Sequence, residues 1–185
     1  MTLFGDGLDA AVQKTFTRPA PRTAPAQMRY LVKQLKGTGA AARLLRISQR
    51  TVERYVKAQI KKPRPDLAAR LEREVNKRWQ PQIRARARRK AATTDGIVID
   101  TRARIGYTAP IGTTDDARIR HLTVALPPRY AARLFEAREQ GATEQQLREI
   151  AAEGLKEVYF QDGGHRAGSL EQVRFTDIEH LEFDL

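Results

Sequence analysis

Residues 38–59 read TGAAARLLRISQRTVERYVKAQ, and their pattern predicts the structure of the first half of the chain. Its Ala/Leu-rich first half predicts a short helix ending at Leu45, and Ser48 predicts the N-cap of a second helix through Gln59. Only a tight connection separates the two helices, which is the spacing of a helix-turn-helix. Arg46 stands where such turns often carry glycine, and a non-glycine residue at positive φ is strained, so this position departs from the motif.

The two short helices have an inward and an outward side. Their apolar positions, expected to interlock, are Ala42, Ile47, Val52 and Tyr55. Their outward positions are Gln49, Arg50, Thr51, Arg54 and Lys57. Arginine and glutamine can form paired hydrogen bonds with guanine and adenine edges, so this side predicts contact with a DNA groove. An ordinary helix pair with a solvated basic face has the same pattern, and both interpretations stay open at this point.

Further helices and a linker flank this motif. Apolar residues at helical spacing from Met28 to Leu35 predict a helix that ends at Gly37. A second amphipathic run from Leu67 to Trp79 follows two prolines. Residues 17–25 contain three prolines and no apolar periodicity, so they predict an extended linker.

Positive charge is concentrated in one block of the chain. Residues 27–92 carry 20 Lys/Arg against 4 Asp/Glu, a formal net charge of +16, whereas residues 93–185 carry 11 against 16, or −5. Such a concentration of positive charge attracts phosphate groups, and the resulting binding to nucleic acid weakens as the salt concentration rises. The side chains expected to contact phosphates after the motif are Lys61, Lys62 and Arg64. A later run, interpreted as a phosphate-binding arm or a solvated tail, contains Arg84, Arg86, Arg88, Arg89 and Lys90.

The acidic second half has a different pattern. Alternating apolar residues at 122–126 predict a half-buried strand, Pro128 a helix reaching Gly141, and Thr143 with Gln146 a capping box for another helix. This order resembles a ribbon-helix-helix subunit, which buries its strand by pairing with a second copy. A dimerisation or partner-docking module is therefore expected, with a homodimer as one outcome. The acidic tail from residue 170 suits partner contact and a solvated edge strand equally well.

The predicted fold is mainly α with a small β component, divided into four segments. These are residues 1–26 (N-terminal segment and Pro-rich linker), 27–92 (basic helix-turn-helix domain with basic arm), 93–118 (linker) and 119–185 (acidic strand-helix-helix module). No apolar run is long enough to span a bilayer, and the chain has no cysteine. The three histidines lack ligand spacing, so no metal site is expected. We expect a cytoplasmic protein that is not associated with a membrane.

Thr113 and Thr114 lie after Pro110 and Gly112 and directly before two aspartates, Asp115 and Asp116. A helix N-cap explains this pattern, because threonine supplies an acceptor and aspartates in the first turn suit the helix dipole. An exposed reactive hydroxyl is the other interpretation. Two adjacent aspartates without a third acidic ligand make a weak magnesium site, and spacing alone identifies no acid/base pair.

Six stretches together extend over essentially the whole chain: 3–8 (LFGDGL), 28–37 (MRYLVKQLKG), 48–57 (SQRTVERYVK), 61–71 (KKPRPDLAARL), 109–116 (APIGTTDD) and 175–180 (FTDIEH). In these stretches the chain resembles the telomere terminal proteins of linear actinobacterial chromosomes and plasmids.

The resemblance implies a protein primer that becomes covalently joined to the 5′ end of a linear replicon through a threonine hydroxyl. By motif position this threonine is Thr114, and Thr113 is the alternative. Asp115 and Asp116 would mimic primer phosphates or assist metal ions. The implied partners are telomeric DNA with its 3′ overhang, a companion telomere-binding protein and a DNA polymerase that supplies Mg²⁺ and the deoxynucleotide. The chain would then be an acceptor rather than an enzyme, associated with the nucleoid at replicon ends.

A reversible helix-turn-helix regulator or plasmid-maintenance protein is the alternative. Charge and helix spacing fit both functions, and only the Thr113–Asp116 turn and the resemblance separate them.

Overall fold

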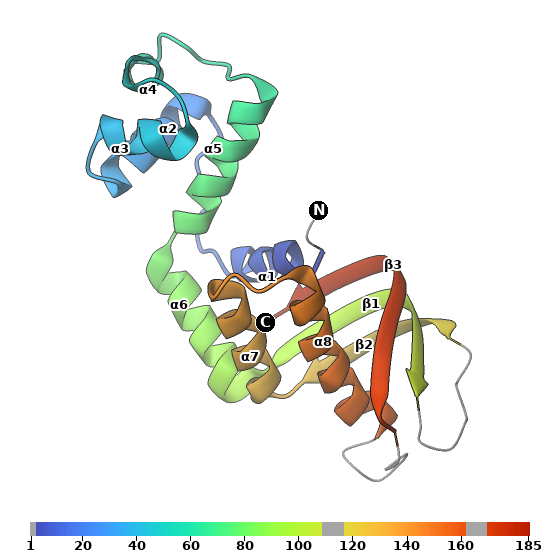
Figure 1. The fold of residues 1–185 in the computed structure, drawn as a ribbon. Coiled ribbons are helices and arrows are strands. Elements are labelled where there is room, and N and C mark those ends of the chain that lie inside the picture. The colour runs from blue at the N-terminus through green and yellow to red at the C-terminus, as the bar shows by residue number, and fades with distance from the viewer. Residues whose placement is uncertain (1–2, 109–116, 162–169) are drawn as a thin grey trace. The chain divides into compact units, whose positions relative to one another are not determined.

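The computed structural model describes residues 3–108, 117–161 and 170–185 (Figure 1). The chain forms two compact units, one from residues 16–81 and one that combines residues 1–15 with residues 82–185. The described residues are mainly helical and include one three-stranded antiparallel sheet. The predicted fold class, mainly α with a small β component, is confirmed.

The first unit, residues 16–81, is helical. Its helices are α2 (Ala24–Gln34), α3 (Thr38–Leu45), α4 (Gln49–Val56) and α5 (Pro65–Arg78). One apolar cluster holds them together, and its fully buried members include Met28, Leu31, Leu45, Val52, Leu71 and Val75. These are the residues at helical spacing in the sequence, so burial of the apolar stripes explains why short helices persist here.

The Pro-rich stretch belongs to this helical unit. The backbone N–H of Thr17 donates to Gln80 Oε1 at 3.1 Å, and Trp79 Nε1 donates to the carbonyl of Arg18 at 2.9 Å. Helix α2 begins at Ala24 and takes Pro25 into its first turn, where the fixed φ of proline is already helical. The unit therefore starts at residue 16, not at the expected residue 27.

The second unit is built around a sheet. Its elements are α1 (Leu3–Lys14), α6 (Pro81–Lys90), the short π-helix η1 (Ala91–Asp95), β1 (Ile97–Thr108), β2 (Arg118–Leu126), α7 (Pro128–Glu139), α8 (Glu144–Leu155), the short π-helix η2 (Lys156–Phe160) and β3 (Gln172–Asp184). The strand order is β2-β1-β3, and both pairings are antiparallel. Helices α1, α7 and α8 pack on the sheet, whose strands run behind them in Figure 1.

The strand register separates a buried face from an exposed face. Ile99 on β1 lies opposite Val124 and Phe183, and all three are buried. The next residue, Asp100, lies opposite Thr123 and Glu182 on the other face. Successive strand residues point to opposite faces, so this alternation places the helices on one side and leaves charged side chains on the other.

The sheet changes two expectations for the second half of the chain. Residues 97–108 fall in the expected linker 93–118, yet they form β1, the central strand. The expected strand at 122–126 lies in β2 and pairs with β1 of the same chain. It therefore needs no second copy to be paired, and the ribbon-helix-helix arrangement is not confirmed. Helix α7 does begin at Pro128, and the capping box of Thr143 with Gln146 is present.

Within the described ranges, none of the helices is both long and apolar enough to cross a bilayer.

Candidate nucleic-acid interface

The turn between α3 and α4 contains one left-handed residue. Arg46 adopts a left-handed conformation with φ 54° and ψ 48°. This conformation lets the N–H of Ile47 donate to the carbonyl of Ala42 at 3.1 Å and close α3. Ser48 then caps α4, because its side chain accepts from the N–H of Thr51 at 3.2 Å. Three residues, Arg46 to Ser48, thus connect the two short helices.

The expected interlocking positions hold the helices together. Ala42, Val52 and Tyr55 are buried, and Ile47 packs against the same cluster while half-buried. Burial raises the pKa of the Tyr55 hydroxyl, with a smaller opposing effect from Arg54, so this side chain stays neutral in the core. Because α3 and α4 interlock through apolar side chains, the polar side of α4 is held at a fixed angle to its neighbours.

The outward side of α4 is a row of polar and basic groups. Gln49, Arg50, Arg54 and Lys57 are exposed, as expected, and Thr51 is half-buried. Gln49 Nε2 donates to Thr38 Oγ1 at 3.0 Å and to Glu53 Oε1 at 3.1 Å, which orients its amide. Arg50 and Arg54 are four residues apart on one helical face and can reach the same surface.

A basic segment continues beyond α4. Lys61, Lys62 and Arg64 are exposed in the connection to α5. Among the residues that the structure describes, no carboxylate lies within salt-bridge distance of these three or of Arg50 and Arg54 on α4. The 16–81 unit carries 17 Lys/Arg against 4 Asp/Glu, a formal net charge of +13. These cations are therefore available to an external anion.

Two further arginines belong to this surface and were not predicted. Arg43, near the end of α3, and Arg46, in the turn, are both exposed. In the sequence, Arg46 stood out only for its conformation, as a non-glycine residue in the turn. The signal that could have found both is their position on the polar side of α3 and its turn, next to the outward residues of α4. We call these eleven residues the basic α4 surface: Arg43, Arg46, Gln49, Arg50, Thr51, Arg54, Lys57, Lys61, Lys62, Arg64 and the cap Ser48.

The expected basic arm at residues 84–90 is corrected by the structure. These residues form α6 in the other unit, where Arg84 is only 7% exposed. Arg84 and Arg138 lie 3.6 Å and 2.9 Å from the carboxylate of Asp9, and Arg88 forms an ion pair with Glu139. Desolvation lowers the pKa of Arg84, with a further contribution from Arg88. Arg84 and Arg88 therefore form ion pairs within the second unit and are not part of an exposed basic arm.

The other members of that run remain on the surface. Arg86 and Arg89 are exposed, and Lys90 is exposed while paired with Asp95 at 2.6 Å. Their contribution to phosphate binding stays a prediction. Thr113, Thr114, Asp115 and Asp116 lie outside the described residues, so their role also stays a prediction.

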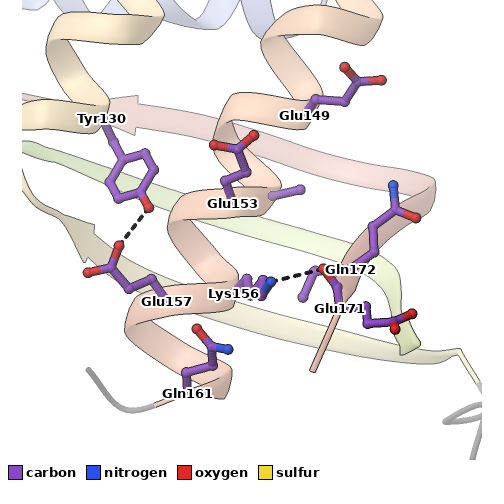
Figure 2. Close-up of a pocket in the computed structure, with 10 residues that line it drawn as sticks. Tyr130, Glu149, Glu153, Lys156, Glu157, Gln161, Glu171 and Gln172 are labelled. Carbon is purple, nitrogen blue, oxygen red and sulfur yellow. Dashed lines mark hydrogen bonds between the residues drawn. The ribbon is translucent and has the colours of Figure 1, made fainter. Parts of the chain in front are cut away.

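An acidic hollow lies in the second unit between the α8–η2 helix and the start of β3 (Figure 2). It has a volume of about 730 Å³, and its carboxylates are Glu149, Glu153, Glu157 and Glu171. Lys156 Nζ donates to the backbone carbonyl of Glu171 at 2.9 Å. Carboxylates repel phosphate, so this hollow is a poor nucleic-acid site and a better match for a basic partner.

The charges around this hollow are already paired in part. Tyr130 Oη donates to Glu157 Oε2 at 2.7 Å, and Arg129 forms an ion pair with the same carboxylate. Arg129 and Tyr130 lower the pKa of Glu157, while burial and Glu157 raise the pKa of Tyr130. Both shifts favour the states already present at neutral pH, so neither group is suited to proton exchange there. Across the described ranges, no three His, Asp or Glu side chains are grouped as metal ligands.

Comparison with protein-family models, with curated proteins and with solved structures gave no significant match.

Proposed function

We propose that this chain binds duplex DNA, with α4 (Gln49–Val56) in the major groove. The observation that carries the proposal is the fixed presentation of Arg50 and Arg54 on an interlocked, capped helix. An α-helix fits the major groove, and arginine can make a bidentate contact with guanine. The amide of Gln49 is oriented by its hydrogen bonds to Thr38 and Glu53. It would either give up these bonds to pair with an adenine edge, or keep them and help to hold the helix in position.

The rest of the basic α4 surface would contact the sugar-phosphate backbone. Lys57, Lys61, Lys62 and Arg64 follow α4 directly, and Arg43 and Arg46 precede it. Contacts between such cations and the phosphates on both sides of the groove would position α4 on the duplex. Phosphate contacts do not themselves distinguish one base sequence from another. Binding should therefore weaken as salt rises, with a slope set by the number of phosphates that these residues neutralise.

We further propose that the chain is a telomere terminal protein. This part rests on the resemblance, above all on residues 109–116, and not on geometry. The Thr114 hydroxyl would attack the α-phosphorus of a deoxynucleotide while the bond to the bridging oxygen breaks and pyrophosphate leaves. The hydroxyl proton would pass to a base in the partner polymerase, which also supplies Mg²⁺. Thr113 is the alternative acceptor.

The proposed partners follow from the same role. The basic unit would hold telomeric DNA, and the carboxylates of the acidic hollow would contact the companion telomere-binding protein or the polymerase. The protein would then reside in the nucleoid at replicon ends. A homodimer remains part of this proposal, although β2 no longer supplies a reason for it.

A reversible DNA-binding regulator is the second candidate. The basic α4 surface favours it equally, because an operator-binding protein needs the same helix and no covalent step. The two functions differ in whether DNA stays attached after denaturation in hot detergent.

The priming proposal is tested by labelling. The protein is incubated with labelled deoxynucleotide, Mg²⁺, overhang DNA, companion protein and polymerase, and resolved after boiling in detergent. We expect label on the wild type and on Thr113→Val, and none on Thr114→Val. Equal label on wild type and on the double variant Thr113→Val/Thr114→Val would rule out this turn as the acceptor, and no label on wild type would favour the regulator.

A further inference from the structure

Aromatic rings gather where η2 (Lys156–Phe160) packs against the end of β1. The rings of Tyr107 and Phe160 lie edge to face, with centroids 5.7 Å apart, and those of Tyr159 and Phe160 lie 5.0 Å apart. Tyr159 is 44% exposed and is one of three large apolar side chains that are exposed in the described part of the chain. A tyrosine ring left in solvent beside other rings offers a stacking surface.

Two arginines on β2 complete this group. The guanidinium of Arg120 lies 5.6 Å from the centroid of the Phe160 ring, and its Nε donates to the carbonyl of Ile105 at 3.4 Å. Arg118 lies opposite Ile105 in the strand register and is exposed. Residues two apart on a strand share a face, so Arg118 and Arg120 lie on the face of the sheet that carries Tyr107. We name Tyr107, Arg118, Arg120, Tyr159 and Phe160 the aromatic–arginine cluster.

The acidic neighbour of the cluster is directed elsewhere. Glu157 lies in the same short helix as Tyr159, but its carboxylate is bonded to Tyr130 and paired with Arg129. Arg118 has no carboxylate partner among the described residues. Arg118 is therefore an exposed cation that an external anion can reach, within a unit that carries 17 Lys/Arg against 18 Asp/Glu.

We infer that the aromatic–arginine cluster binds single-stranded DNA. Tyr159 would stack on an unpaired base, and Arg118 would contact the adjoining phosphate. Duplex DNA is a poor ligand because its base faces are covered by their neighbours. Charge complementarity favours a polyanion over an apolar protein surface, because Arg118 presents an exposed positive charge beside the rings. The cluster belongs to the unit formed by residues 1–15 and 82–185, whereas the basic α4 surface belongs to the unit formed by residues 16–81. Single-strand binding by the cluster therefore goes beyond the proposed duplex binding.

The position of the cluster along the chain connects it with the proposed priming turn. Tyr107 precedes, and Arg118 follows, the segment that contains Thr113 and Thr114. The cluster therefore flanks, in sequence, the turn that is proposed to carry the priming hydroxyl. The inference does not require the covalent linkage and can be tested without polymerase or nucleotide.

The test measures binding of the full-length chain to a fluorescent oligo(dT) single strand and to a mixed-sequence duplex of equal length, by anisotropy. Loss of a base-aromatic stack weakens binding by about 5-fold to 150-fold. We expect a loss in this range for single-strand binding by Tyr159→Ala, a smaller loss for Arg118→Ala, and duplex binding within twofold of wild type for both. Tyr159→Phe keeps the ring and should bind like wild type.

A matched control and a second measurement keep the outcome decisive. Arg102→Ala removes an exposed arginine from the other face of the same sheet, where Arg102 pairs with Glu179 at 2.8 Å, and should leave single-strand binding unchanged. Photo-crosslinking of wild type to oligonucleotides carrying 5-iododeoxyuridine should label Tyr159, as mapped by mass spectrometry. Single-strand binding within twofold of wild type for Tyr159→Ala, or crosslinks confined to residues 16–81, would overturn the inference. Neither result would affect duplex binding by Arg50 and Arg54.

Discussion

Replacement of Arg46 tests the geometry of the turn on which the DNA-binding proposal depends. A non-glycine residue in the left-handed region costs about 1–2 kcal/mol, and Arg46 occupies that region with φ 54°. Glycine removes this cost but loses about 0.5–1 kcal/mol through the greater freedom of the unfolded chain. Arg46→Gly should therefore stabilise the unit formed by residues 16–81 by about 0.5–1 kcal/mol.

Arg46→Ala is the matched control, because it removes the same charge and keeps the strained conformation. Trp79 is the single tryptophan, and its ring lies 4.9 Å from that of Tyr30 inside the same unit. Its fluorescence during urea unfolding therefore reports this unit alone. A urea midpoint of unfolding for Arg46→Gly at or below that for Arg46→Ala would contradict the left-handed conformation of residue 46. Both variants should reduce the salt slope of duplex binding by about one unit if Arg46 contacts a phosphate.

Further predictions concern the interface and the second unit. Arg50→Ala and Arg54→Ala should each weaken duplex binding by about 1–3 kcal/mol if they contact bases, measured by anisotropy at fixed salt, and an unchanged affinity in both would exclude α4 as the reading helix. Gly96→Ala should destabilise the second unit by more than about 2 kcal/mol in chemical denaturation, because a Cβ would lie 2.1 Å from the carbonyl oxygen of Leu126 and φ is +77°; a near-neutral effect would contradict this approach. The pKa of Glu157 is lowered by Arg129 and Tyr130, so its stabilising contribution is present above about pH 4.3 and is lost as pH falls through the folded-state pKa. In Glu157→Gln, the free energy of unfolding should accordingly fall less steeply as the pH is lowered into the acid range. An unchanged pH dependence would argue against the pairing of Glu157 with Arg129 and Tyr130.

The sequence was most informative where a local rule sets the structure. The cap of Ser48, the capping box of Thr143 and the helix start at Pro128 each depend on residues within a few positions of one another. The interlocking positions of the helix-turn-helix follow from helical spacing, and Arg46 was singled out because the turn geometry demands a positive φ. In each case a short window of sequence contains all the groups that interact.

Interactions between distant segments were not predictable in the same way. Arg84 is buried because Asp9, 75 positions earlier in the chain, supplies a carboxylate that no local pattern reveals. Helix α1 belongs to a unit whose other residues begin after residue 81. Because this unit is built from two separate stretches of the chain, no single change of composition marks its boundary at residue 15. Strand β1 was missed in part because its buried positions include the small or polar residues Thr101 and Ala103, which weaken the apolar alternation. The aromatic–arginine cluster likewise joins segments that are about 50 residues apart.

The chain contains no cysteine, so a single introduced thiol can carry a photo-crosslinker at one chosen position. Lys57→Cys places the crosslinker at the end of α4, and Glu136→Cys places it on the exposed side of α7 as a control. After irradiation with labelled duplex DNA at low salt, we expect a much higher crosslinking yield from position 57 than from position 136. Equal yields, or a higher yield from position 136, would contradict the claim that α4 faces the DNA.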